Sequence, residues 1–485
     1  MLRRWRTLTF FLVGSLLPCL ALASSAFENT AIVRSIELGG SLVHVSTTYA
    51  IKALEPDQTT YHIALAKDER DKTSWIEAKV KGQTKALDIV ELGETRAGHL
   101  LAVTLPKMLS VNGTMNLVLE TVQTHATRVY PQRAAQTDPQ LLKYDTNLFV
   151  LSPYATLVQR TKIKSSSPNI LSYSTPEGVD EFVRDGSATK SGATITYGPY
   201  YNVVPSANSQ FVSQYQQMVS VYYRFDYPVL EVTKLRRSAE ISHWGANLNI
   251  EDKIYLHNAG PTLKGHFSRL EHQSQNYFRR LSSHILSDLT LHLPPGITSA
   301  YFYDLNGNVS TSNLRSSPSV SKTSKGNQYG ILEMRPRYPV LGGWNYSFTL
   351  GFNTPLQDSV SWDATNEKYI IGVPVMTHIP GSVVDEAEIR IILPEGATEV
   401  ESISPFATRS TAVSTHIAYL DTVGRPTISF AYDDLTDKHA GMIYVSYKIP
   451  IAAHLKKPVA IATAFLSLFL FGFTARRVDL RLHKN

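Results

Sequence analysis

Residues 42–51 read LVHVSTTYAI, and the alternation in this decapeptide decides the fold class. The positions that share one parity are Val43, Val45, Thr47, Tyr49 and Ile51. Successive side chains of an extended chain point to opposite faces, so this period of two predicts a strand with one buried face. The same alternation recurs in three later segments, residues 219–227, 387–393 and 443–449.

Between such segments, the sequence predicts tight turns and only short helices. Asn306-Gly307, within the run DLNGNV, predicts a hairpin turn. Thr175-Pro176 predicts the start of a helix that runs to about residue 184, and Asp138-Pro139 predicts the start of another. In both cases a capping residue precedes a proline at the first helical position. We therefore expect a mostly β protein with short helices, of the α+β class.

A short repeat predicts how the strands are divided. RSIEL at residues 34–38 returns as RSAEI at residues 237–241, close to an alternating segment each time. This repeat predicts two tandem units that meet near Pro228. We expect two antiparallel β-sandwich-like domains, at residues 24–228 and 229–450. A five-residue match is short, so it leaves open whether the two domains are related.

An apolar run near the first residue predicts a signal peptide. Arg3, Arg4 and Arg6 precede the apolar residues 8–22, and small residues lead to Ala23. A charged region, an apolar region and small residues at the cleavage site are the three parts of a secretory signal. We expect residues 1–23 to be removed.

A second apolar run predicts one transmembrane helix. Residues 458–475 contain no charged side chain and are bracketed by Lys456-Lys457 and Arg476-Arg477. Eighteen helical residues span about 27 Å, close to the thickness of a thin hydrocarbon core. With a cleaved signal, this arrangement predicts a single-pass type I protein with its bulk outside the cytosol and residues 476–485 as a cytosolic tail.

The composition fits that compartment and gives no support to nucleic-acid binding. The single cysteine, Cys19, lies in the predicted signal, so the mature domains must rely on apolar cores rather than disulfides. The formal net charge is +6, but the excess lies in residues 1–23 and 476–485. Residues 24–475 hold 40 basic and 40 acidic side chains, so we expect no nucleic acid among the partners.

Motifs for catalysis are mostly missing from the sequence. There is no G-x-S-x-G, H-E-x-x-H, P-loop or D-x-D pattern. Ser319–Lys322 fits S-x-x-K, but it lies in a Ser/Lys-rich stretch where composition explains the match. Asp433, Asp434 and Asp437 could bind calcium, although a solvated turn between strands is the preferred interpretation. We interpret residues 243–252 as a strand with Trp244 in the core rather than as a ligand site.

Two surface features are predicted instead of a catalytic site. The sequons predict glycan acceptors at Asn112, Asn308 and Asn345, with one or two of them occupied and Asn308 the strongest candidate. The second feature is a stripe of small residues on one face of the predicted membrane helix: Ala460, Thr463, Ala464 and Ser467. Small stripes let helix backbones approach closely inside a bilayer, so this face predicts packing against a partner helix.

Segments that carry a family resemblance run through the chain. They are residues 27–34 (FENTAIVR), 37–40 (ELGG), 144–147 (YDTN), 197–200 (YGPY), 227–229 (YPV), 243–252 (HWGANLNIED), 307–312 (GNVSTS), 335–339 (RPRYP) and 342–344 (GGW). In these segments the chain resembles the ribophorin I family, the first-named accessory subunits of the oligosaccharyltransferase of the endoplasmic reticulum.

The resemblance implies a non-catalytic, single-pass subunit without a cofactor, in the endoplasmic reticulum membrane. Its expected partners are the multi-span catalytic subunit, the other subunits of the complex, nascent polypeptides and the lipid bilayer. The complex transfers a preassembled glycan from dolichyl diphosphate to asparagine in N-x-S/T sites, and family members are expected to stabilise it and to help present acceptors. The short tail resembles the fungal form, so translocon or ribosome contacts of the longer animal tail are not carried over.

Two other classes of function remain open at this stage. A tethered lumenal hydrolase would use the aspartates at 433, 434 and 437. A cell-surface adhesion or receptor protein would also suit a β-rich body with one helix, and it would carry glycans processed beyond the high-mannose stage.

Overall fold

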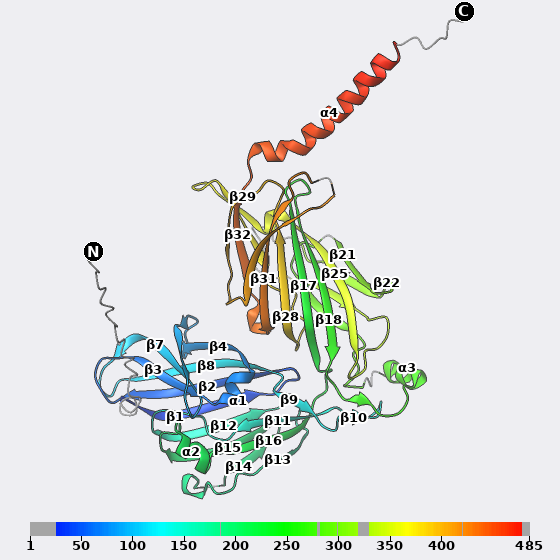
Figure 1. The fold of residues 1–485 in the computed structure, drawn as a ribbon. Helices are drawn as coiled ribbons and strands as arrows, with labels where there is room; N and C mark the ends of the chain where they lie inside the picture. The colour runs from blue at the N-terminus through cyan, green and yellow to red at the C-terminus, as the bar shows by residue number, and fades with distance from the viewer. Residues whose placement is uncertain are drawn as a thin grey trace, which may run out of the picture.

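The computed structural model describes residues 26–184, 186–278, 282–297, 299–318, 329–419 and 421–477. The predicted signal at residues 1–23, the S-x-x-K match at residues 319–322 and residues 478–485 lie outside these ranges. Figure 1 shows a strand-rich molecule with one long helix near its C-terminus, so the mostly β prediction is confirmed. The helices are α1 (Lys67–Lys72), α2 (Ser209–Tyr215), α3 (Arg269–Tyr277) and α4 (Ile451–Ala475), with 3-10 turns at Asp180–Phe182, Leu356–Asp358 and Asp437–His439.

An eight-stranded sheet forms the centre of the first half of the chain, in the order β14-β15-β12-β1-β2-β8-β4-β5. Its strands are β1 (Phe27–Glu37), β2 (Leu42–Ala53), β4 (Thr73–Val80), β5 (Ala86–Leu87), β8 (Thr114–Thr124), β12 (Thr156–Lys164), β14 (Ala188–Ser191) and β15 (Thr194–Val203). Smaller sheets accompany it: β3 (Gln58–Leu65), β7 (His99–Leu109) and β6 (Ile89–Glu94) in one, and β13 (Ile170–Tyr173), β16 (Met218–Arg224), β11 (Leu141–Asn147) and β9 (Thr127–Val129) in the other. We call this part the first unit.

A second eight-stranded sheet follows, in the order β22-β21-β25-β18-β17-β28-β31-β30. Its strands are β17 (Leu230–Ser242), β18 (Asn247–Asn258), β21 (Ser299–Asp304), β22 (Gly307–Asn308), β25 (Asn345–Pro355), β28 (Val383–Ile392), β30 (Ser410–His416) and β31 (Arg425–Leu435). Two smaller sheets comprise β20 (Leu289–Leu293), β24 (Gly330–Met334) and β23 (Ser312–Arg315), and β26 (Val360–Asp363), β27 (Lys368–Pro374), β32 (Met442–Lys448) and β29 (Thr398–Ile403). We call this part the second unit. The short pair β10 (Arg133–Ala134) and β19 (Thr262–Leu263) links the two units.

The two large sheets have the same strand order when one is read in reverse. In the first unit β1 pairs antiparallel with β2 and parallel with β12. In the second unit β17 pairs antiparallel with β18 and parallel with β28. Each large sheet is therefore mixed, where the sequence predicted antiparallel pairing. The repeated RSIEL and RSAEI motifs fall on the equivalent strands β1 and β17, and each places a buried arginine there, Arg34 and Arg237.

The alternation read from the sequence corresponds to buried faces. On β2 the odd-numbered side chains from Val43 to Ile51 are buried and the even-numbered ones are half-buried. Separate apolar cores lie under the two large sheets, and the largest cluster draws its residues from Leu230 to Tyr447. The domain limits at residues 228 and 229 stay a prediction.

Several local predictions were wrong, each for a tertiary reason. Residues 175–184 contain one 3-10 turn instead of a helix, because Phe182 packs into the core. Asp138 closes a turn by accepting the backbone N–H of Ala135 at 2.8 Å, and β11 then begins at Leu141. Core packing in the first place and strand pairing in the second outweighed the local helix-capping signals.

Two strand ends also differ from the prediction. β16 ends at Arg224, and Tyr227 is exposed just before Pro228, which cannot donate to a strand ladder. The hairpin at residues 304–309 forms, but Asp304 pairs with Gly307, so the loop is Leu305-Asn306. Gly307 takes the positive φ of +110° that the connection requires.

Candidate functional sites: the C-terminal helix, its base and the junction between the units

Helix α4 is long and apolar enough to cross a membrane. It comprises 25 residues with a mean hydropathy of 1.9 in its most apolar window, and its side chains are not buried within the molecule. The helix begins seven residues before the predicted segment 458–475, and Pro458 lies inside it. A proline inside a helix removes a backbone hydrogen bond and bends the helix. Figure 1 shows α4 leaving the end of the second unit and bending away from it.

The predicted stripe of small residues lies on the exposed surface of α4. The Thr463 hydroxyl donates to the Ala460 carbonyl and the Ser467 hydroxyl donates to the Thr463 carbonyl, both at 2.8 Å. Because both hydroxyls bond within the helix, the stripe presents a shallow surface with no free donor. Its role in packing stays a prediction.

Two lysines fasten the first turns of α4 to the second unit. Lys457 Nζ lies 2.7 Å from Asp421 Oδ1 and 3.1 Å from Glu395 Oε2. Lys456 contacts the Thr422 hydroxyl. The segment also approaches the loop after β28 closely, because a Cβ on Gly396 would lie 2.6 Å from that of Ala453.

The electrostatics of this base favour an ionised Glu395. Burial alone would raise the pKa of Glu395, but it accepts hydrogen bonds from the backbone N–H groups of Val423 and Thr422, from the Thr422 hydroxyl and from Lys457. These bonds lower the pKa of Glu395 to about 2. The sequence carries no local motif for this cluster, because its acidic members precede Lys457 by 36 or more residues.

The three predicted glycan acceptors are all exposed. Asn112 lies in the turn between β7 and β8 with a φ of +62°. Asn308 lies on the short strand β22. Asn345 begins β25, and its Oδ1 lies 2.6 Å from His257 Nδ1. Exposure leaves each asparagine accessible to modification, and glycan occupancy stays a prediction.

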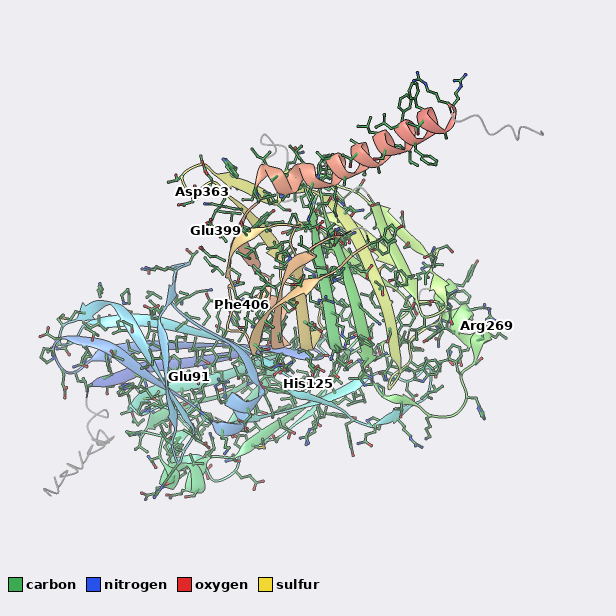
Figure 2. All side chains as sticks on the ribbon, turned by 45° about the horizontal axis from the view of Figure 1, so that its top comes forward. Glu91, His125, Arg269, Asp363, Glu399 and Phe406 are labelled. Carbon is green, nitrogen blue, oxygen red and sulfur yellow. The ribbon has the colours of Figure 1, made fainter. Side chains whose placement is uncertain are left out.

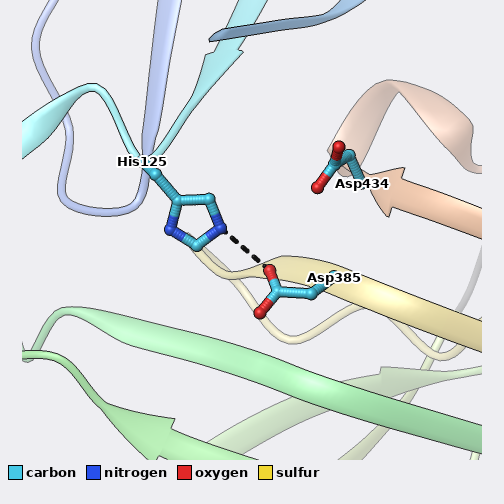
Figure 3. A group of neighbouring side chains, drawn as sticks. All are labelled: His125, Asp385 and Asp434. Atoms are coloured by element: carbon cyan, nitrogen blue, oxygen red, sulfur yellow. Dashed lines mark hydrogen bonds and ion pairs between the residues drawn. The ribbon is translucent and has the colours of Figure 1, made fainter.

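The three aspartates that a hydrolase would use do not converge on one another. Asp433 pairs with Arg409 at 2.7 Å, and Asp437 pairs with His44 of the first unit at 3.1 Å. Asp434 lies near His125 and Asp385 (Figure 3). The three carboxylates therefore have different neighbours, and Asp434 and Asp437 each lie near a histidine of the first unit.

His125 connects the two units through carboxylates. Its Nε2 lies 2.9 Å from Asp385 Oδ1 and its Nδ1 lies 3.1 Å from Glu231 Oε1. Hydrogen bonding to Asp385 and Glu231 raises the pKa of His125 to about 10. Among the described residues, His125, Asp385 and Asp434 are close enough to hold a metal ion. An imidazolium with both ring nitrogens occupied fits an ion-pair contact between units better than a metal ligand.

An aromatic cluster adds an apolar part to the same junction. The Trp75 ring of the first unit lies 5.6 Å from Phe406 and 4.9 Å from His439, both in the second unit. Figure 2 shows Phe406 between the two units and His125 further along the junction. Burial lowers the pKa of His439 to about 4, so this ring stays neutral near pH 7. These contacts join residues more than a hundred positions apart, so no local sequence pattern predicts them.

The His125 contact predicts a pH-dependent stability. The pKa of His125 is about 10 in the folded chain and about 6.5 in the unfolded chain. The protonated ring therefore stabilises the fold fully below about pH 6.5, and this stabilisation is lost as the pH rises toward about 10. Because the His125 side chain is 44% exposed, solvent screens the pairs, and we expect a contribution of about 1 kcal/mol. Urea denaturation of His125→Gln and wild-type chains should differ by that amount at pH 6 and converge near pH 10. A constant difference across this range would contradict the assignment.

An open groove also lies where the units meet. It has a volume of about 1570 Å³ and is lined by the tyrosines 130, 173 and 222 and by three cationic side chains. The Tyr222 hydroxyl donates to the Tyr130 carbonyl at 2.6 Å, and their rings meet edge to face at 5.7 Å. All four strands of the sheet β13-β16-β11-β9 contribute residues to the lining, so the groove lies across this sheet. His257 and Gly343 of the second unit complete the lining.

Comparisons with known proteins cover most of this architecture. A family model described as ribophorin I matches residues 27–476. The dolichyl-diphosphooligosaccharide–protein glycosyltransferase subunit 1B of Oryza sativa subsp. japonica is 32% identical over 365 residues, covering 75% of this chain and 70% of the rice protein. Subunit 1 of the corresponding transferase of Caenorhabditis elegans is 26% identical over 466 residues, covering 96% of this chain and 74% of the nematode protein.

The solved structures that align with this chain are only weakly similar to it. A yeast LTA4 hydrolase aligns with 44% of this chain and 31% of its own at a TM-score of 0.26 and 11% identity, a likeness too weak to interpret. The family model, in contrast, extends from β1 through both sheets to the end of α4. The chain belongs to the ribophorin I family.

Proposed function

We propose that this chain is a non-catalytic subunit of an oligosaccharyltransferase, which moves a preassembled glycan from dolichyl diphosphate to asparagine in N-x-S/T sites. The observation that carries the proposal is the family match over residues 27–476, which includes both units and α4. Relatives in rice and nematode bear the name of subunit 1 of this transferase. In this role the chain stabilises the complex in the membrane of the endoplasmic reticulum, with both units in the lumen.

Physical chemistry supports placing the bond-making step on another chain. Transfer from a lipid pyrophosphate needs positive charge to offset the phosphates and a site at the depth of the lipid. The apolar part of α4, residues 458–475, offers no acidic or basic side chain. The multi-span catalytic subunit is therefore the proposed partner that supplies this chemistry, and this chain contributes surface and helix packing.

The groove at the junction supports a second part of the role, contact with nascent polypeptide. Each tyrosine presents a large apolar ring with a polar end, which suits the varied side chains of a polypeptide. A photoreactive amino acid in place of Tyr130 is expected to cross-link to an acceptor peptide in the intact complex. Equal labelling from Leu92, which is exposed on β6 of the first unit, would contradict a specific groove.

The central experiment is purification in a mild detergent followed by a glycosylation test. We expect the chain to co-purify with a multi-span membrane protein, and its depletion to leave N-x-S/T sites of many secreted glycoproteins unoccupied. Re-expression of the chain should restore occupancy. A chain that purifies alone, together with full occupancy after depletion, would overturn the proposal.

The glycans of the chain itself separate the proposal from a cell-surface role. Asn308→Gln is expected to remove one glycan from the purified chain, and the glycans that remain should be sensitive to endoglycosidase H. A resident of the early secretory pathway keeps high-mannose glycans. Processed, resistant glycans would favour the adhesion or receptor alternative.

A further inference from the structure

Large apolar side chains gather on two turns at the end of the second unit from which α4 leaves. Ile417, Tyr419 and Val423 lie on the connection between β30 and β31, and Trp244 lies on the turn between β17 and β18. These four side chains are between 66% and 91% exposed. The sequence predicted Trp244 as a core residue of one strand, but residues 243–246 form a turn, so its indole points away from the core.

Both turns lie directly beside the base of α4. The β30–β31 connection holds α4 through the Lys457–Asp421 pair at 2.7 Å and the contact between Lys456 and Thr422. Trp244 lines the same hollow as Ala453 and His454 of α4. The rings of His243 and His454 are 5.5 Å apart.

The first turns of α4 present apolar side chains as well. Ile451 and Leu455 are four residues apart, on one face of the helix, and both are exposed. Lys457, in contrast, is bound to the second unit. We call the six side chains Trp244, Ile417, Tyr419, Val423, Ile451 and Leu455 the juxtamembrane patch.

The connection to α4 is too short to separate this patch from a bilayer that α4 crosses. β32 ends at Lys448 and α4 begins at Ile451. The seven helical residues before Pro458 rise only about 10 Å, and the headgroup layer on each side of a hydrocarbon core is about 5–8 Å thick. The ion pairs at the base hold α4 against the turns, which leaves no flexible spacer.

The charges and residue types next to the patch suit a lipid surface. The carboxylates of Glu395 and Asp421 are compensated by Lys456, Lys457 and Arg425. Tryptophan and tyrosine are enriched at the membrane–water interface because one end of each ring system is apolar and the other is polar.

We propose that the lipid interface covers the juxtamembrane patch, so that the second unit rests on the bilayer with Trp244 and Tyr419 in the headgroup layer. The proposal rests on α4 spanning a membrane, as the proposed function requires. It assigns the two turns a role as a membrane-contact surface, in addition to the helix. The consequence is a fixed height and tilt of both units above the membrane.

Site-specific labelling of the full chain tests this directly. In a Cys19→Ser background the chain contains no cysteine, so Tyr419→Cys, Val423→Cys, Leu468→Cys and Leu92→Cys each carry a single environment-sensitive NBD label. The purified full chain is placed in nanodiscs made either from ordinary or from acyl-brominated phosphatidylcholine. We expect bromolipid to quench labels at 419 and 423 at least threefold more than the label at Leu92, which lies in the first unit.

The remaining labels separate the possible outcomes. Quenching at Leu468, near the middle of the apolar residues 458–475 of α4, reports the membrane span itself. Its absence would overturn the anchor and with it the proposed function. Quenching at Leu468 but not at 419 and 423 would overturn only the membrane-contact surface. Labels at 419 and 423 that are shielded from aqueous iodide only in the assembled complex, and never by lipid alone, would assign the patch to a protein partner and also overturn the proposal.

Discussion

Replacement of Arg237 by methionine is expected to lower the free energy of unfolding of the second unit by about 3–5 kcal/mol. Arg237 and Asp252 are both 0% exposed and face each other across β17 and β18. Arg237 Nε and Nη2 donate to the two Asp252 oxygens at 2.6 Å each. The same guanidinium donates to the Pro374 carbonyl at 2.6 Å and to the Thr377 hydroxyl at 2.5 Å. Methionine would leave the buried Asp252 carboxylate without its counterion, and this uncompensated charge accounts for most of the expected destabilisation.

Urea denaturation of the full chain in detergent, monitored by tryptophan fluorescence, measures the decrease in the free energy of unfolding. The matched control is Arg236→Met on the same strand, because Arg236 is 51% exposed and lies 3.7 Å from Glu388. Surface pairs of this kind contribute up to about 1 kcal/mol. An Arg237→Met chain as stable as the Arg236→Met chain would show that the buried pair is not important for folding.

A double variant distinguishes the destabilisation caused by an unpaired buried charge from the net contribution of the ion pair to stability. Replacing Arg237 with methionine and Asp252 with leucine removes both charges together. Apolar replacements of buried pairs are often neutral or stabilising, so we expect the double variant to recover more than half of the loss. Failure to recover would mean that the hydrogen bonds to Pro374 and Thr377 dominate instead.

The parts of this fold that the sequence could predict are those encoded by neighbouring residues. The alternation at residues 43–51 reports burial directly, because strand geometry turns a period of two into one buried face. The apolar run of α4 is equally local, and so are the exposed sequons. In the sequence, the duplication of the two units appears only as the five-residue match RSIEL and RSAEI. In the structure, the two large sheets share one strand order, and each has a buried arginine on the equivalent strand, β1 or β17.

What could not be predicted depends on contacts between distant residues. Asp138 and Thr175 carry good helix-start signals, but pairing of β11 and packing of Phe182 decide the local structure. Trp244 is a large aromatic residue of the kind usually found in a core, but it lies on a turn and is exposed. His125 and Glu395 gain their perturbed pKa values from partners that no spacing rule connects. The His125 site depends on the contact between the two units, and the Glu395 site depends on the contact between the second unit and α4.

Substitution of leucine for both Ala460 and Ala464 is expected to reduce recovery of the multi-span partner at least tenfold, while the chain stays in the membrane. These alanines lie four residues apart on one exposed face of α4. Small side chains allow two helix backbones to approach closely, and inside a bilayer this packing is a main source of association. Two leucines would hold the helices apart, and a tenfold loss corresponds to about 1.4 kcal/mol.

Ala462 provides the matched control, because its position 200° from Ala460 around the helix places it on the opposite face. Ala462→Leu makes the same chemical change and should leave co-purification unaltered. Carbonate extraction of both variants checks that α4 remains inserted, so loss of the partner can be assigned to helix packing rather than to loss of the anchor. If the double variant keeps its partner, the small stripe is not the contact, and the complex must be held by the two units and the junction surfaces outside the hydrocarbon core.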